Sequence, residues 1–236
     1  MATATQILAE IKPLGSDGYR KILAKHGVTQ DAYGVKVEYL KKILKREKKN
    51  YQLALDLFET GVYDAMYLAG LLADSAKMTK KDLNRWLEKA GGGPLCGSTV
   101  PMTAAGSPYG HDVALEWIES KKDYAAAAGW ATLLGIVSTT DDEKLDMAEL
   151  KKLLQRVQKN IHNEPDSVRY AMNSFVIALG TYVLPLRDLA LQAAEKIGKV
   201  SVDMGDTACK VPFAPEYMRK CIQRNPNGKK RASAGC

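Results

Sequence analysis

The stretch DSVRYAMNSFVIAL, residues Asp166–Leu179, contains the pattern that decides the fold. An acidic residue opens it. Val168 and Ala171 then follow at a spacing of three, which places both on one side of a helix, while Arg169 lies on the outer side. The pattern predicts a helix over residues 166–182 with an apolar stripe. Because one such helix cannot bury its stripe alone, neighbouring helices must stack against it.

Helical periodicity continues in both directions from this stretch and predicts about ten helices. The connections between them are mostly three to eight residues long, which favours antiparallel neighbours. The run Val200–Val202 is short and β-like. The expected helices cover residues 7–14, 19–26, 36–46, 51–60, 62–73, 79–87, 111–120, 123–138, 146–161, 166–182 and 186–197.

These helices pair into units of roughly 35 to 45 residues, the scale of HEAT-type repeats. We therefore expect an all-α, HEAT-like helical-repeat solenoid of about ten or more antiparallel helices; an irregular helical bundle is the competing architecture. Residues 1–198 are expected to form the solenoid domain, and residues 199–225 a C-terminal capping segment with a helix. Residues 226–236 are expected to form a flexible basic tail, because they are too polar to fold alone.

The bulk composition is that of an ordinary globular protein, with 46% hydrophobic and 26% charged residues. No run approaches the roughly 20 apolar residues that a membrane span needs, and no export signal is visible at the N-terminus. The four cysteines have no metal-binding spacing, so free thiols are expected at Cys96, Cys209, Cys221 and Cys236. We expect a cytoplasmic monomer without a membrane partner, a metal or a cofactor.

The net charge of +7 is concentrated in two segments. Lys36–Lys49 holds seven basic residues against two acidic ones, and residues 218–236 hold six basic residues and no acidic one. Two basic segments on a mildly acidic remainder favour a polyanionic partner such as DNA; a solvated helix face with a disordered tail is the alternative. The candidate DNA-binding residues are Lys36, Lys41, Lys42, Lys45, Arg46, Lys48, Lys49, Lys210, Lys229, Lys230 and Arg231.

Residues 91–110, GGGPLCGSTVPMTAAGSPYG, form an uncharged segment in this otherwise charged chain. Six glycines and three prolines predict a loop. Its glycine spacing resembles that of a phosphate-binding P-loop, but Ser98 stands where that loop needs lysine, and no hydrophobic strand precedes it. The segment is therefore not expected to bind a nucleotide.

Four stretches resemble the AlkD-type DNA alkylation repair proteins: Tyr33–Lys45, Ala54–Phe58, Ala65–Leu72 and Asp166–Asn173. The similarity covers roughly residues 30–198. It implies a C-shaped HEAT-like solenoid whose basic concave face holds duplex DNA. Active members of that family excise positively charged N3- or N7-alkylated purines.

The resemblance also implies where the active site belongs, and the uncharged segment occupies that place. Active members have a Trp-rich segment with a catalytic Asp there, because a carboxylate and aromatic faces stabilise the cationic state through which the base leaves. Aligned at Val100 and Pro101, the Trp positions fall on Gly92 and Gly93. The catalytic Asp position falls on Gly97.

Two further positions implied by the resemblance also differ. Ala127 falls near the position of a phosphate-binding Arg, and Ser174 falls at a later Trp that should line the lesion. No catalytic residue of the active members is therefore carried over. Trp86, Trp117 and Trp130 lie at apolar helical positions, so we expect them in the core.

The weak catalytic candidates that remain are Asp203, Asp206 and His111. The stretch containing the two aspartates is expected to be a capping turn; a polar cluster near the DNA is the alternative. Two carboxylates are too few to predict a metal site. The leading hypothesis is a protein that binds double-stranded DNA, alkylated or not, and lacks the usual alkylpurine excision residues. The alternatives are an active glycosylase with substitute residues and a protein–protein scaffold.

Overall fold

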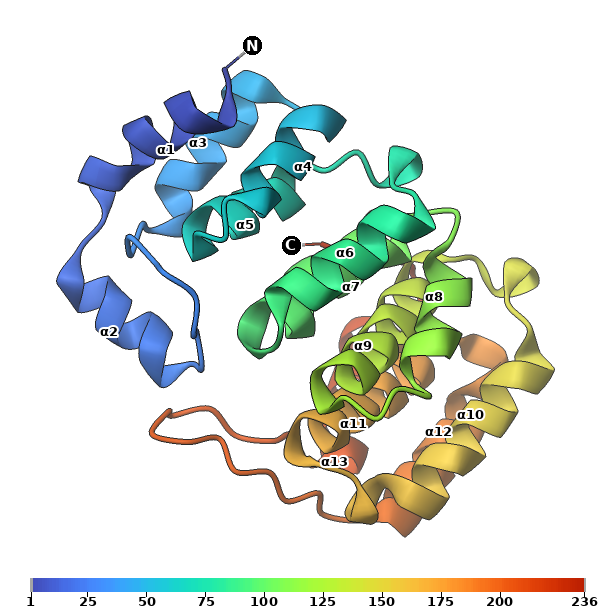
Figure 1. Cartoon of the computed structure of the whole chain (residues 1–236). Coiled ribbons are helices and arrows are strands. Elements are labelled where there is room, and N and C mark those ends of the chain that lie inside the picture. Colours follow the sequence, from blue (N-terminus) through green and yellow to red (C-terminus); the bar gives the residue numbers. More distant parts are fainter. Residues whose placement is uncertain (1, 236) are drawn as a thin grey trace.

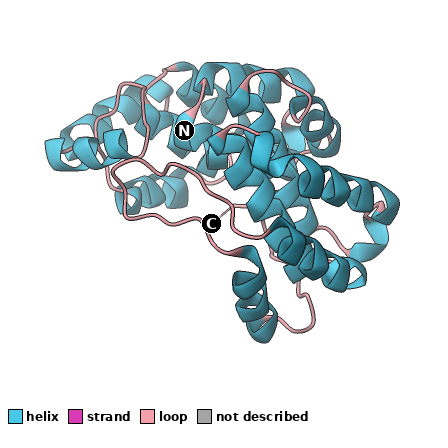
Figure 2. Cartoon of the chain, turned by 90° about the horizontal axis from the view of Figure 1, so that it is seen from below, coloured by secondary structure: helices cyan, strands magenta, loops and turns pink. Residues whose placement is uncertain are grey.

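The computed structural model describes residues 2–235, and the regular structure within this range is entirely helical (Figures 1 and 2). The predicted all-α fold is confirmed, and Val200–Val202 forms no strand. The α-helices are α1 (Ala4–Ile11), α2 (Asp17–Lys25), α3 (Val37–Glu47), α4 (Tyr51–Glu59), α5 (Tyr63–Leu72), α6 (Lys80–Ala90), α7 (Val100–Ala105), α8 (Gly110–Trp117), α9 (Asp123–Thr139), α10 (Met147–Asn160), α11 (Asp166–Tyr182), α12 (Arg187–Ile197) and α13 (Ala214–Arg224).

The helices stack in two rows that follow one arc (Figure 1). The inner row runs through α3, α5, α7, α9, α11 and α13, each packed against the next. The outer row runs through α1, α4, α6, α8, α10 and α12, and it covers the other side of the inner helices. Each row supplies the apolar neighbour that the other needs, as expected for a helical-repeat solenoid.

Local sequence signals define several helix ends. The side chains of Thr79 and Asp82 accept each other's backbone N–H groups, which forms a capping box at the start of α6. Asn50 caps α4 and Asp146 caps α10 through backbone N–H groups that would otherwise lack a partner. Gly91 ends α6 with φ of 61°, a left-handed conformation that glycine adopts without steric cost.

The three tryptophans lie in the core, as predicted. Trp86 and Trp130 are at most 1% exposed, and Trp117 is also buried. Trp86 stacks on Phe58 with ring centroids 4.1 Å apart, which joins α4 to α6. Their burial leaves none of the three available for stacking on a DNA base.

The uncharged segment is mainly helical, which corrects the predicted loop. Leu95–Thr99 forms a π-helical turn that leads directly into α7. Leu95, Thr99 and Val100 are buried at helical spacing, and this burial outweighs the low helix propensity of the glycines and prolines. The packing is tight: a Cβ added at Gly70 of α5 would lie 2.4 Å from Cγ2 of Thr99.

The C-terminal segment 226–235 lies against the structure, which differs from the flexible arm that its composition predicts. The backbone N–H of Arg231 donates to the carbonyl of Ser138 (2.8 Å), and Nζ of Lys230 donates to the carbonyl of Val137 (2.9 Å). These two carbonyls belong to the last turn of α9, where helical carbonyls lack partners and a cation is favourable. Lys230 also pairs with Asp142 at 2.8 Å.

No single helix in residues 2–235 is long and apolar enough to cross a membrane. Within the described residues, α11 and α12 taken together are the one pair that passes by length and composition, and the chain bends by 114° between them. Both helices have buried faces that pack against each other and against their neighbours in the arc.

Candidate nucleic-acid interface

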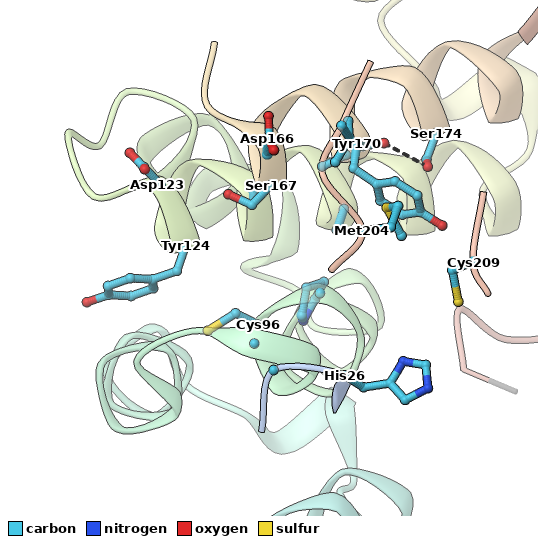
Figure 3. A pocket seen from close by; sticks show the side chains of 18 of the residues that line it. His26, Cys96, Asp123, Tyr124, Asp166, Ser167, Tyr170, Ser174, Met204 and Cys209 are labelled. Atoms are coloured by element: carbon cyan, nitrogen blue, oxygen red, sulfur yellow. Dashed lines mark hydrogen bonds between the residues drawn. The ribbon is translucent and has the colours of Figure 1, made fainter. Parts of the chain in front are cut away.

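A cleft of about 1010 Å³ opens along the inner row (Figure 3). Segments that are distant in the chain form its walls: the end of α2, the uncharged segment, α9, α11 and the loop between α12 and α13. In Figure 1 this loop (orange) extends toward α2 (blue), and residues of both line the cleft. The arc thus brings its two ends to one concave site.

The pairing of α9 with α11 produces one wall of the cleft. The first turns of these two helices place Asp123, Tyr124, Asp166 and Tyr170 at the cleft. Figure 3 shows these side chains along one wall, with His26 on the opposite side. None of the five was predicted as a site residue, because an acidic residue in a first helical turn or an aromatic on an amphipathic helix is usually structural.

Four of the five positions that the family resemblance marked come together in this cleft, whereas Gly92 is not among the residues that line it. Gly93, Gly97, Ala127 and Ser174 all line it, although they come from three different elements. Their side chains provide no carboxylate, no guanidinium and no aromatic face. These four positions therefore share one cleft, and none of the four carries a group that stabilises a departing alkylated base.

Three carboxylates line the cleft, and two of them have structural partners. Asp166 pairs with Arg169 and accepts the backbone N–H of Asp203 at 2.8 Å. Asp203 in turn accepts the N–H of Gly205 at 2.8 Å, which closes a tight Asx-type turn. The carboxylate of Asp123 has no hydrogen bond or ion pair among the described residues.

The cleft itself is electrically balanced. Three cationic side chains line it, and they match the three carboxylates in number: Lys25, Lys122 and Arg231. Lys122 is moreover paired with Glu88 at 2.9 Å. A strong attraction for phosphate must therefore come from charges outside the cleft.

Several predicted DNA-binding cations are available on α3. Lys41, Lys42 and Lys45 are exposed, and none of them forms an ion pair within residues 2–235. Lys42 lies over the Tyr39 ring, with Nζ 5.0 Å from its centroid. They do not line the cleft but lie on the inner-row helix nearest the N-terminal end of the arc. Among the predicted DNA-binding cations, Lys36, Lys48, Lys210 and Lys229 are likewise exposed and form no ion pair in the same range.

Other predicted cations have partners within the protein. Arg46 forms a two-pronged pair with Glu10 at 2.9 and 2.8 Å and also bonds Glu47, contacts that raise its pKa. Lys49 donates to the carbonyl of Leu71 at 3.0 Å, and burial lowers its pKa. Their charges are compensated or committed locally, as is that of Lys230 in the C-terminal segment.

The remaining catalytic candidates lie outside the cleft. Nε2 of His111 is 2.7 Å from a carboxylate oxygen of Glu149, a contact that connects α8 with α10 in the outer row. Asp206 is exposed and is not among the cleft residues. The structure therefore brings only Asp203 of the three candidates to the concave site.

Cys96 and Cys209 both line the cleft, and the buried one, Cys96, is not activated. Burial raises the pKa of the Cys96 thiol to about 12, so the nucleophilic thiolate is scarce at neutral pH. Cys209 and Cys221 are free thiols, and Cys236 lies outside the described residues.

Over residues 2–235, no group of three or more His, Cys, Asp or Glu side chains is placed to hold a metal ion.

The turn at Asp203 gives the first testable expectation. Asp203→Ala removes the acceptor for Gly205 and should lower stability by about 1 kcal/mol, or a few degrees in melting temperature. Asp203→Asn keeps an acceptor and should lose less. Asp206→Ala is the matched control and should be neutral, because its carboxylate accepts no hydrogen bond among the described residues. An Asp203→Ala protein that melts higher but loses DNA affinity would instead make Asp203 a binding residue.

An arc of paired helices with a cleft along its inner row defines a helical-repeat protein with a concave binding surface. Residues 7–218 match the family described as DNA alkylation repair enzyme, and the chain belongs to that family. Uncharacterized proteins of Listeria innocua serovar 6a and Listeria monocytogenes serovar 1/2a are 33% and 34% identical to it over 232 residues. These alignments cover 95% of this chain and 99% of each relative.

A solved structure shares the whole fold, with a TM-score of 0.89, 29% identity and coverage of 100% of both chains. It is described as "a new family of proteins related to the HEAT-like repeat DNA glycosylases with affinity for branched DNA structures". The predicted HEAT-like solenoid and the resemblance to DNA alkylation repair proteins are thereby confirmed.

Proposed function

We propose that this protein binds DNA on the concave side of its arc and does not excise alkylated purines. The supporting observation is that Gly93, Gly97, Ala127 and Ser174, which the family resemblance marks, meet in one cleft and carry no catalytic group themselves. Membership of the DNA alkylation repair family and the DNA affinity of the structural relative support the binding half of the proposal.

The preferred partner in this proposal is branched DNA, as described for the structural relative. The distribution of charge supports it. Exposed cations without ion pairs lie on α3 toward one end of the arc and on α13 at the other, whereas the cleft between them is balanced. Diverging DNA arms carry their phosphates away from a central junction, so two separated basic regions fit them better than one uniformly basic groove.

Binding to matched probes tests this function. We expect a fluorescent four-way junction to bind about tenfold more tightly than a linear duplex of equal length, with affinity that falls steeply as salt increases. Binding without any preference between the two probes would reduce the proposal to general duplex binding. No salt-dependent binding to either probe would overturn it in favour of a protein–protein scaffold.

We also propose that the protein acts as a monomer in the cytoplasm. The buried thiol of Cys96 and the free thiols of Cys209 and Cys221 fit a reducing compartment. Light scattering coupled to size exclusion measures the oligomeric state directly.

One observation favours a second candidate, a glycosylase with a substitute carboxylate. Asp123 lines the cleft beside Tyr124, and its side chain has no partner among the described residues. A free carboxylate next to an aromatic ring has the chemical features needed to stabilise a cationic leaving base. This candidate requires base-excision activity, which is the readout that separates it from the proposed function.

A further inference from the structure

The open face of α13 combines exposed aromatic rings with cations. Phe213, directly before the helix, is 39% exposed, and Tyr217 is 48% exposed. Lys220 and Arg224 are also exposed. Spacings of four, three and four residues place all four side chains on one side of the helix, which we call the α13 stripe.

The α13 stripe has no structural role in the core. The opposite face of the helix, with Ala214, Pro215 and Met218, is buried where α13 packs against α11 and α12. Two large rings left on one exposed helix face are characteristic of an interaction surface, because their apolar area would otherwise be covered.

The cations of the stripe are also available. Arg219, on the same helix, pairs with Glu195 of α12. Lys220 and Arg224, by contrast, form no ion pair anywhere in residues 2–235. Rings that can stack on bases, next to uncompensated cations that attract phosphates, are the combination by which proteins hold unpaired nucleotides.

The position of the stripe connects it to the cleft. The segment that enters α13 lines the cleft through Val202, Met204 and Cys209 before it reaches Phe213. Helix α13 is also the last member of the inner row. The stripe therefore begins four residues after the last of these cleft residues, on the helix at the C-terminal end of the inner row.

We infer that the α13 stripe binds the unpaired bases of a DNA strand at a fork or junction, with Phe213 and Tyr217 stacking on bases and Lys220 and Arg224 neutralising phosphates. The inference rests on the proposed function, since it names the part of branched DNA that this end of the arc holds. Lys220 and Arg224, which form no ion pair within residues 2–235, complement a polyanionic strand, and this favours nucleic acid over an apolar protein partner.

The test compares two forked probes in fluorescence anisotropy. One carries an unpaired arm with bases, and the other carries an arm of equal length made of abasic nucleotides. The wild-type protein should prefer the arm with bases about tenfold, because only that arm can stack. The variant Phe213→Ala/Tyr217→Ala should lose this preference while binding the abasic probe as the wild type does. Phe213→Tyr/Tyr217→Phe keeps both rings and should retain it.

Lys220→Gln/Arg224→Gln should weaken binding to both probes equally, because phosphates are present in both arms. Arg219→Gln is the control on the same helix; it removes one charge, not two, and it should cost less than half of the double variant's loss because Arg219 is already paired with Glu195. All variants alter exposed side chains, so melting temperatures close to wild type serve as the folding control.

The outcomes separate the inference from the proposed function. A wild-type protein that binds forks with salt-dependent affinity but does not distinguish the two arms overturns the inference alone. Unchanged discrimination in Phe213→Ala/Tyr217→Ala also overturns it, and the stripe would then be a surface for another class of partner. Absence of fork binding by the wild type overturns the proposed function and the inference with it.

Discussion

Methylated duplex DNA incubated with the purified protein should retain its 3-methyladenine and 7-methylguanine. The reason follows from the alignment with the family, in which the catalytic carboxylate falls on Gly97 and the aromatic faces fall on glycine and serine positions. Enzymes accelerate reactions by about 10⁶-fold or more, so an intact active site would be unmistakable in this assay. We expect release at the uncatalysed background rate, measured by chromatography of the freed bases.

A variant gives this assay its internal control. Asp123 is the residue to replace, because it is the cleft carboxylate without a partner in the described structure. Asp123→Asn should leave the background rate unchanged, because the proposed function includes no catalysis. Base release far above background by the wild type would contradict the proposed function. Its loss in Asp123→Asn would then assign the chemistry to Asp123 and favour the second candidate.

The triple variant Lys41→Gln/Lys42→Gln/Lys45→Gln should lose about 100-fold in DNA affinity near 0.15 M salt. Each phosphate contact contributes about 0.9 to the slope of log affinity against log salt, so three lost contacts flatten the slope by about 2.7. The loss should be similar for different DNA sequences, since phosphate contacts carry no base information. Salt titrations of a fluorescent junction measure both quantities.

A matched variant removes the same charge from another surface. Lys151, Lys152 and Lys159 are exposed on α10 in the outer row and, within the described range, form no ion pair. Their triple replacement by Gln changes the net charge equally but should leave the salt slope nearly unchanged. Equal losses in both variants would show that only net charge matters, and unchanged affinity in the α3 variant would remove the phosphate contacts proposed for that helix.

The fold could be predicted well because its determinants are local. Apolar residues at helical spacing, short connections and acidic or hydroxyl caps such as Thr79 are visible in the sequence and survive in the structure. The uncharged segment was predicted wrongly because glycine and proline content is also local, whereas its helical state depends on packing. Thr99 fits against Gly70 of α5, a contact between distant parts of the chain that composition cannot reveal.

The candidate site could be predicted only in part. Alignment with the family identified positions that do gather in one cleft, including Gly97 and Ser174. It could not show which cations already form ion pairs within the protein, because their partners lie far away in sequence: Arg46 pairs with Glu10, and Lys230 pairs with Asp142. The partnerless carboxylate of Asp123 was missed for the related reason that absence of a partner is a property of the folded chain.

The attachment of the C-terminal segment to α9 affects which parts of the arc can flex. In a simple repeat array each unit is coupled only to its neighbours, so one end can flex or unfold without the rest. Here Lys230 reaches across 93 positions of sequence to Val137, while Arg187 of α12 holds the start of the same segment through Pro226. This tether couples the last repeat to the middle of the arc. We therefore expect the C-terminal half to unfold as one cooperative unit and to keep a fixed curvature. The N-terminal repeats should then be the more flexible part, which adjusts to a bound ligand.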